Sequence, residues 1–151
     1  EFSRNSRLDA LQASYGKYLL PYLEDWTERV IKIAEYYHSE FKEFCYVPKT
    51  REHVRSVYHN YVIQTQNRNE LSLYLQEYGI ETKIHYPIPI VEQPAWQKLS
   101  VKSEPVPFVK KQKEEILSLP IYAELNDIEV EYVAQKVKGF FLETQLVKEA
   151  V

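Results

Sequence analysis

The residues best placed for chemistry are a histidine and a tyrosine, His85 and Tyr86, at the start of a proline-rich loop. Pro87 and Pro89 follow, and each lacks a backbone N–H donor and fixes φ, so a strand cannot continue through them. A proline also pushes the preceding residue toward extended backbone, which stiffens the loop. Polar side chains on a stiff loop lose little entropy when they bind a ligand. The segment therefore predicts either a ligand-binding pair or a structural histidine at a strand end.

A second candidate site is the cluster Asn5, Ser6 and Arg7, which precedes an apolar stripe with helical spacing. It would bring an amide, a hydroxyl and a guanidinium together beside free backbone donors and the positive end of a helix dipole. Such a group suits a phosphate or another anion. Asn5 or Ser6 is equally suited to cap the helix, because either side chain can accept from the first free N–H groups. Anion binding and simple capping both remain open from the residues alone.

Other catalytic and metal-binding patterns are missing from the sequence. The three glycines stand far apart, so there is no phosphate-binding loop. A Cys45–His catalytic pair is conceivable, but no local signature supports it. The carboxylates are scattered, so no acid–base pair can be chosen from them. We predict no metal site, because one cysteine cannot complete a structural zinc site and no metal-ligand spacing relates the histidines, His38, His53, His59 and His85.

Composition narrows the class of protein. A chain of 151 residues with 44% hydrophobic content is typical of one ordinary soluble domain. The formal net charge of -3 argues against a nucleic-acid binder. The single cysteine fits a reducing compartment, and we see neither a membrane-spanning run nor a signal peptide, so we expect a cytoplasmic location. Methionine is absent, which indicates a piece of a longer protein.

Residues 1–43 predict a long leading helix, which would link the rest of the chain to a domain that precedes it. Pro21 lies inside its apolar stripe and should kink or split the helix. The two halves could simply pack on each other. We favour the alternative, in which the half up to Leu20 packs on a body outside this chain. The stripe recurs close to every 3.6 residues and consists of Leu8, Leu11, Tyr15, Leu19, Tyr22, Trp26, Val30, Ile33, Tyr37, Phe41 and Phe44.

Residues 44–151 predict an α+β domain with a small, mostly antiparallel sheet that helices cover on one face. Strands are expected where branched and aromatic residues gather, at residues 57–63 and 82–86. Helical segments are expected at residues 67–78, 93–99, 108–118 and from Asn126 onward.

The ends of two of these helices carry clear signals. Gly79 should end the helix before it in the left-handed conformation. Asn126 and Glu129 form a capping box at the start of the last helix. The buried stripe of that helix should comprise Ile128, Val130, Val133, Val137, Phe140 and Phe141.

Five segments carry a resemblance to a known family: residues 5–13, 57–63, 79–89, 93–96 and 117–122. In this order they resemble the C-terminal part of the DegT/StrS-type sugar aminotransferases. Members of this family are pyridoxal-phosphate enzymes of fold type I that aminate keto-sugars carried on nucleotides. The resemblance covers nearly the whole chain.

The resemblance implies roles for individual residues. Asn5 would contact the cofactor phosphate of the neighbouring subunit in a homodimer, with Arg7 nearby. His85 and Tyr86 would line the sugar-nucleotide site at the dimer interface. His59 also matches a family position, but we assign it to support of its strand. Glutamate would donate the amino group, and the product would be an amino-sugar for a surface polysaccharide or a glycosylated metabolite.

The sequence also departs from the family. Ser3 stands where a glycine is usual before the asparagine, and Val91 and Glu92 replace a common His-Leu pair. The lysine that anchors the cofactor as a Schiff base would lie upstream of Asn5, and no lysine of this chain matches it. We therefore expect the C-terminal domain of a transferase, inactive alone. The alternative is a stand-alone, non-catalytic module that uses the same surface for ligand binding or assembly.

Overall fold

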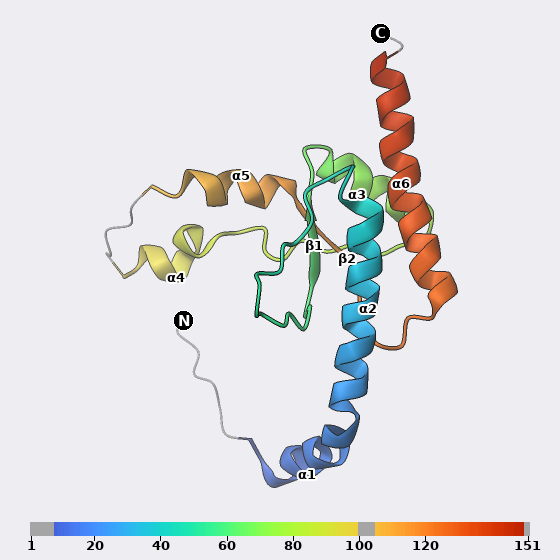
Figure 1. Ribbon diagram of the computed structural model, residues 1–151. Helices are drawn as coiled ribbons and strands as arrows, with labels where there is room; N and C mark the ends of the chain where they lie inside the picture. Colours follow the sequence, from blue (N-terminus) through green and yellow to red (C-terminus); the bar gives the residue numbers. More distant parts are fainter. Residues whose placement is uncertain (1–7, 100–104, 150–151) are drawn as a thin grey trace.

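A two-stranded antiparallel sheet lies at the centre of an otherwise helical chain (Figure 1). The computed structural model describes residues 8–99 and 105–149. In chain order the elements are α1 (Ala10–Leu19), the 3-10 helix η1 (Leu20–Tyr22), α2 (Leu23–Phe41), β1 (Tyr61–Gln64), α3 (Arg68–Glu77), the 3-10 helix η2 (Ile90–Glu92), α4 (Pro94–Gln97), α5 (Pro107–Glu115), β2 (Ile116–Leu119) and α6 (Asp127–Glu149).

The sheet is wider than its two strands. In the register of β1 and β2, Tyr61 lies opposite Leu119. Single antiparallel bridges then add one residue at each edge, Tyr46 against Gln64 of β1 and Lys83 against Ser118 of β2. The predicted mostly antiparallel sheet is confirmed.

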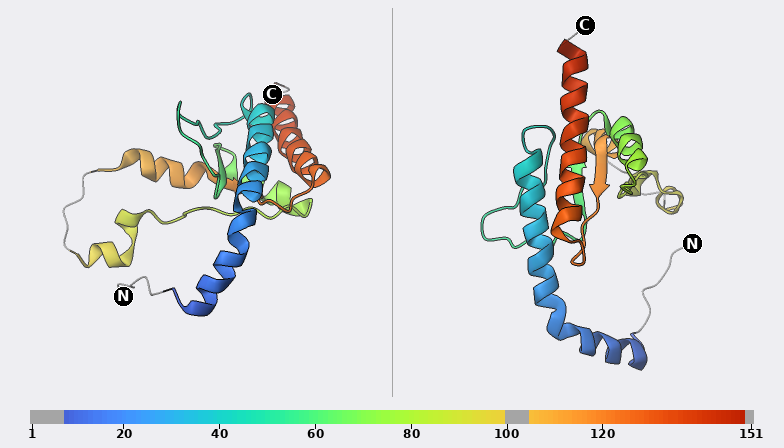
Figure 2. Two further views of the ribbon diagram at one scale, coloured as in Figure 1. Left: turned by 60° about the horizontal axis from the view of Figure 1, so that its bottom comes forward. Right: turned by 90° about the vertical axis from the view of Figure 1, so that its right-hand side faces the viewer.

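One face of the sheet packs against helices. The Tyr61 ring of β1 meets the Tyr37 ring of α2 edge to face, with 5.3 Å between their centroids. Helices α2 and α6 lie side by side (Figure 2), and a stacked contact between Phe44 and Phe141 joins the segment after α2 to α6. The buried core residues of the strands are Tyr61, Ile63, Leu117 and Leu119. On the opposite face, Val62 and Ile116 are half-buried and line a cavity together with residues of α5. The prediction of helices on one face is therefore confirmed.

The leading helix is split at Pro21, as predicted, because η1 separates α1 from α2. Helix α2 enters the core through Ile33, Tyr37 and Phe41, whereas α1 buries no residue at all. The cap was predicted wrongly. Helix α1 begins at Ala10, and the side chain of Asp9, not Asn5 or Ser6, accepts the hydrogen bond from the Gln12 amide at 2.9 Å.

Three of the predicted elements have different bounds in the structure. The expected strand over 57–63 begins only at Tyr61, since Tyr58 takes a left-handed φ of 44°. The expected helix over 108–118 ends at Glu115, because Ile116–Leu119 pairs with β1 as β2. In the expected strand over 82–86, the paired residue is Lys83.

Both predicted helix ends are confirmed. At the end of α3, Gly79 has φ of 74°, the Ile80 amide donates to the Leu75 carbonyl, and the Gly79 amide donates to the Gln76 carbonyl. This pair of hydrogen bonds is the Schellman motif. At α6, the Asn126 side chain accepts from the Glu129 amide and the Glu129 side chain accepts from the Asn126 amide.

The predicted stripe of the last helix is correct except at its first residue. Ile128 is 80% exposed, since the helix meets the core only from Val130 onward.

Within the described residues, no helix is long and apolar enough to cross a membrane.

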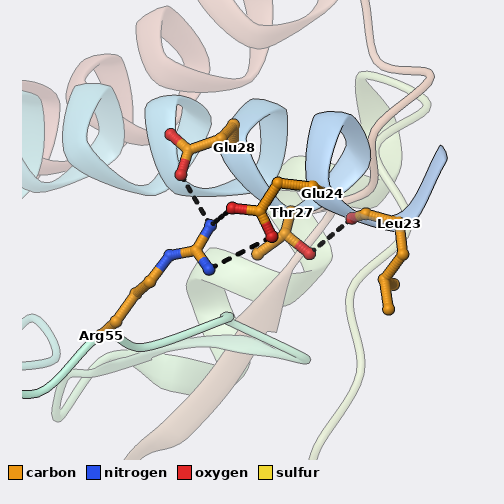
Figure 3. A network of polar contacts seen from close by, with 5 residues as sticks. All are labelled: Leu23, Glu24, Thr27, Glu28 and Arg55. Carbon is orange, nitrogen blue, oxygen red and sulfur yellow. Dashed lines mark hydrogen bonds and ion pairs between the residues drawn. The ribbon is translucent and has the colours of Figure 1, made fainter. Parts of the chain in front are cut away.

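The long connection between α2 and β1, residues 42–60, is tied back to α2 by Arg55 (Figure 3). Arg55 Nη2 donates to Glu24 Oε1 at 2.5 Å and to Glu28 Oε1 at 2.6 Å. These two bonds raise the pKa of Arg55. The connection therefore follows the surface of α2 before it enters β1.

Candidate functional site

The candidate site lies where the segment after Gly79 runs along the free edge of β2. The Ser118 amide donates to the Lys83 carbonyl at 2.7 Å, and the Lys83 amide donates to the Ser118 carbonyl at 3.2 Å. Two residues further on, His85 Nδ1 lies 2.9 Å from Ser118 Oγ. Ser118 is only 5% exposed, so a buried strand residue holds the imidazole in place.

Tyr86 lies beside His85 but is not held in the same way. Tyr86 is 69% exposed. The two rings are nearly perpendicular, at 80°, with 5.4 Å between centroids, and the peptide bond that joins the residues is cis. The structure thus presents a fixed imidazole and a freely accessible phenol next to each other.

Two cavities meet at His85. The first, which we call the Tyr86 cavity, has a volume of about 440 Å³ and lies between residues 85–91 and α5. The second, the α6 cavity, has a volume of about 580 Å³ and lies between residues 79–83, the segment after β2 and the start of α6. Because His85 lines both cavities, it can contact a ligand in either of them.

An ion pair joins the two walls of the Tyr86 cavity. Lys113 Nζ of α5 lies 2.8 Å from Glu92 Oε2 of η2, and both side chains are partly buried. The hydrogen bond with Glu92 raises the pKa of Lys113. Helices α4 and α5 extend from the sheet on the side away from α6 (Figure 1), so this pair ties the extension to the site.

Ser118 and Lys113 were missed in the sequence, whereas His85 and Tyr86 were singled out. A signal for Ser118 existed, since it is the one polar residue in the apolar run Leu117–Leu119 that forms most of β2. No signal distinguished Lys113 from the other lysines of α5. His59 lies just before β1, is exposed, and lines the α6 cavity.

Neither a reactive thiol nor a metal site is supported. Burial raises the pKa of the Cys45 thiol to about 12, so it stays protonated and the conceivable Cys45–His pair has no nucleophile. In the part of the chain that the structure describes, no group of three His, Cys, Asp or Glu side chains could hold a metal ion.

The predicted anion site, Asn5 and Arg7 with Ser6, lies outside the described residues. Since Asp9 provides the cap of α1, the capping role that competed with anion binding is already filled. The phosphate-binding role of Asn5 and Arg7 stays a prediction.

The sequence profile of the DegT/DnrJ/EryC1/StrS aminotransferase family matches residues 1–138. The chain belongs to this family. One family relative is the dTDP-3-amino-3,6-dideoxy-alpha-D-galactopyranose transaminase of Aneurinibacillus thermoaerophilus, which is 36% identical over 90% of this chain and 37% of its own length. Another relative, 36% identical over 91% of this chain and 38% of its own length, is the pleiotropic regulatory protein of Geobacillus stearothermophilus.

Solved structures of other proteins share the fold. S. venezuelae DesV, solved in complex with a ketimine intermediate, has a TM-score of 0.83 at 30% identity, over 90% of this chain and 37% of its own. The PLP-form of Spr1654 from Streptococcus pneumoniae has a TM-score of 0.79 over 91% of this chain and 36% of its own. At 24% identity, that likeness concerns the fold alone. The chain thus spans little more than a third of the length of the relatives that it matches.

Proposed function

We propose that this chain is the C-terminal domain of a pyridoxal-phosphate-dependent aminotransferase that aminates a keto-sugar carried on a nucleotide. The observation that carries the proposal is the family match over residues 1–138. It is supported by relatives named as transaminases of dTDP-linked and UDP-linked sugars. Residues 1–43 would lead from a cofactor-binding domain, and residues 44–151 would form the small domain.

His85 and Tyr86 are the residues that we assign to the sugar nucleotide. The imidazole is fixed by Ser118, so it would bind a ligand without losing much conformational entropy. The exposed ring of Tyr86 offers an apolar face and a hydroxyl, which together suit a sugar. In the intact protein, His85 and Tyr86 would lie at the interface with the neighbouring subunit of a homodimer.

Three lysines of the described residues are poorly suited to anchor pyridoxal phosphate covalently. A lysine that anchors the cofactor must lose its proton readily, and Lys113 has the opposite environment because Glu92 raises its pKa. Lys83 pairs with Glu81 at the surface, and Lys17 is exposed on α1. We therefore assign the anchoring lysine to another part of the intact protein and Asn5 and Arg7 to the cofactor phosphate. The chain described here would bind and orient substrate.

The amino donor and the cellular location are further parts of the proposal. We propose glutamate as the donor and the cytoplasm as the location, as the resemblance of the sequence to sugar aminotransferases implies. The product would be a nucleotide-linked amino-sugar for a polysaccharide or another glycosylated product. A relative named as a spore coat polysaccharide biosynthesis protein supports that destination.

The covalent part of the proposal is tested with borohydride. The isolated chain and the protein from the longest open reading frame that contains it are each incubated with pyridoxal phosphate, reduced, and weighed by intact mass spectrometry. We expect one specific adduct per subunit in the longer protein and none in the isolated chain. A specific adduct on a lysine of this chain would overturn the assignment. A reading frame that starts directly before Glu1 would favour the non-catalytic module.

A further inference from the structure

The hydroxyl of Ser118 has a hydrogen-bonding requirement that constrains His85. Ser118 is 5% exposed, and its backbone amide and carbonyl are both used by Lys83. For the side chain, the His85 imidazole is the one hydrogen-bond partner found in the described residues. Ser118 lines the α6 cavity, but at 5% exposure its hydroxyl has little access to water. A buried hydroxyl whose hydrogen has no acceptor costs free energy, so the imidazole is the favoured acceptor of this hydrogen.

The direction of the hydrogen bond follows from counting donors and acceptors. A neutral imidazole has one N–H donor and one bare nitrogen that accepts. If Nδ1 of His85 carried the proton, it would donate to Ser118 Oγ and leave the buried hydroxyl hydrogen with no acceptor. If Nδ1 is bare, the hydroxyl donates to it at 2.9 Å and both groups are satisfied. Burial therefore favours the second arrangement.

We infer that Ser118 is a positioning residue, which holds neutral His85 with its proton on Nε2 and so turns an N–H donor toward the ligand. The ring lines both the Tyr86 cavity and the α6 cavity. A ligand group that matches this donor is an oxygen acceptor, such as a sugar hydroxyl or a diphosphate oxygen. This choice of ligand, unlike the tautomer, rests on the proposed function.

Nuclear magnetic resonance tests the tautomer in the chain itself. The protein is labelled with 15N-histidine and measured at a pH at which its histidines are neutral, and His85 is assigned by its loss in His85→Gln. We expect a bare, pyridine-like Nδ1 and a protonated Nε2. Protonation at Nδ1 would overturn the inference.

Two substitutions of matched shape separate the hydroxyl from the volume of the side chain. Ser118→Thr keeps the hydroxyl and Ser118→Val replaces it with a methyl group, while both residues are favourable in a strand. Thr should preserve the His85 resonances, whereas Val should move them toward the averaged values of a ring that exchanges tautomers. Equal spectra for the two variants would overturn the role of the hydroxyl.

Calorimetry on the full-length protein then tests the link to the ligand, with UDP-N-acetylglucosamine and dTDP-glucose as probes. For any probe that the parent protein binds, Ser118→Val should bind about five- to tenfold more weakly than Ser118→Thr, the loss expected for one misdirected hydrogen bond. Equal affinities would overturn the link to the ligand. Failure of the parent protein to bind either probe would count against the proposed function, and the tautomer would still be decided by resonance.

Discussion

At the residue scale, the surroundings of each polar side chain decide which of them can act on a ligand. Cys45 is removed from consideration by its burial, which raises the pKa of its thiol to about 12. Lys113 is engaged by Glu92, and His85 is engaged on one side only, by Ser118. At the Tyr86 cavity, the imidazole of His85 and the phenol of Tyr86 are therefore available to a ligand.

The chemistry of these residues was only partly predictable from the sequence. His85 and Tyr86 stood out because two prolines follow them at alternate positions. The serine that fixes the imidazole is 33 residues away along the chain, and only the antiparallel bridge between Lys83 and Ser118 brings them together. No local pattern encodes a contact of that kind.

The cofactor role of Asn5 gives a prediction at this scale. Hydrogen bonds to a charged group contribute about 1.5–3 kcal/mol each, so Asn5→Ala should weaken cofactor binding in the intact enzyme about ten- to a hundredfold. Because the contact would cross the subunit interface, dimer stability should fall with it. A cofactor titration of the two proteins measures the difference, and unchanged affinity would remove Asn5 from the cofactor site.

At the element scale, short structural devices bring the site together. The Schellman motif at the end of α3 turns the chain at Gly79, so that residues 80–85 run back along β2. Helix ends of this kind were predictable, because a glycine or a capping box acts only on its neighbours in the sequence. The end of α5 was not, because the residues of β2 become a strand only through their pairing with β1.

Gly79→Ala should destabilise the domain by about 1 kcal/mol, because a side chain disfavours the left-handed conformation that Gly79 adopts with φ of 74°. The added methyl group meets no atom within 4 Å, so the effect comes from the backbone alone. Gly16→Ala is the matched control. Gly16 lies inside α1, also with open space around it, where alanine favours the helix. Thermal unfolding should show a lower Tm for Gly79→Ala only, and equal Tm values for the two variants would contradict this account.

The Glu92–Lys113 pair should hold α5 against the Tyr86 cavity. Glu92→Gln removes the ion pair with Lys113 that joins the two walls of the cavity. The amides of α5 and η2 should therefore exchange with deuterium faster. Lys111→Gln is the control, because Lys111 lies on the same helix but pairs with Glu115 one turn along it. If both substitutions accelerated exchange equally, the loss of a charged side chain in general would be responsible, and not the loss of the Glu92–Lys113 ion pair.

At the scale of the whole molecule, the chain comprises a packed body, the extension formed by α4 and α5, and the protruding helix α1. The body comprises the sheet with α2, α3 and α6, and buried residues of these elements form one hydrophobic core. Helix α1 turns away from it at η1 (Figure 2) and carries Leu11 at 81% exposure. The apolar period of residues 8–44 predicted the helices correctly, but periodicity cannot reveal which half faces the body of its own domain.

The exposed stripe of α1 predicts its behaviour in the isolated chain. In dilute monomeric protein the amides of α1 should exchange far faster than those of α2, since α1 buries no residue and an isolated helix of its length is only marginally stable. At high protein concentration the stripe should drive association, which Leu11→Lys should reduce in light scattering. Strong protection of α1 in a proven monomer would show that the chain covers this helix by itself.

The most direct test of the proposed function is the response of the bound cofactor to an amino donor. The protein from the longest open reading frame that contains this chain is purified with pyridoxal phosphate, and its absorbance spectrum is followed while L-glutamate is added without sugar. We predict stoichiometric cofactor and complete conversion of its spectrum to that of pyridoxamine phosphate, with release of 2-oxoglutarate. A protein that binds no pyridoxal phosphate, or one whose bound cofactor is unchanged by every amino donor tried, would contradict the assignment of this chain to a sugar-nucleotide aminotransferase.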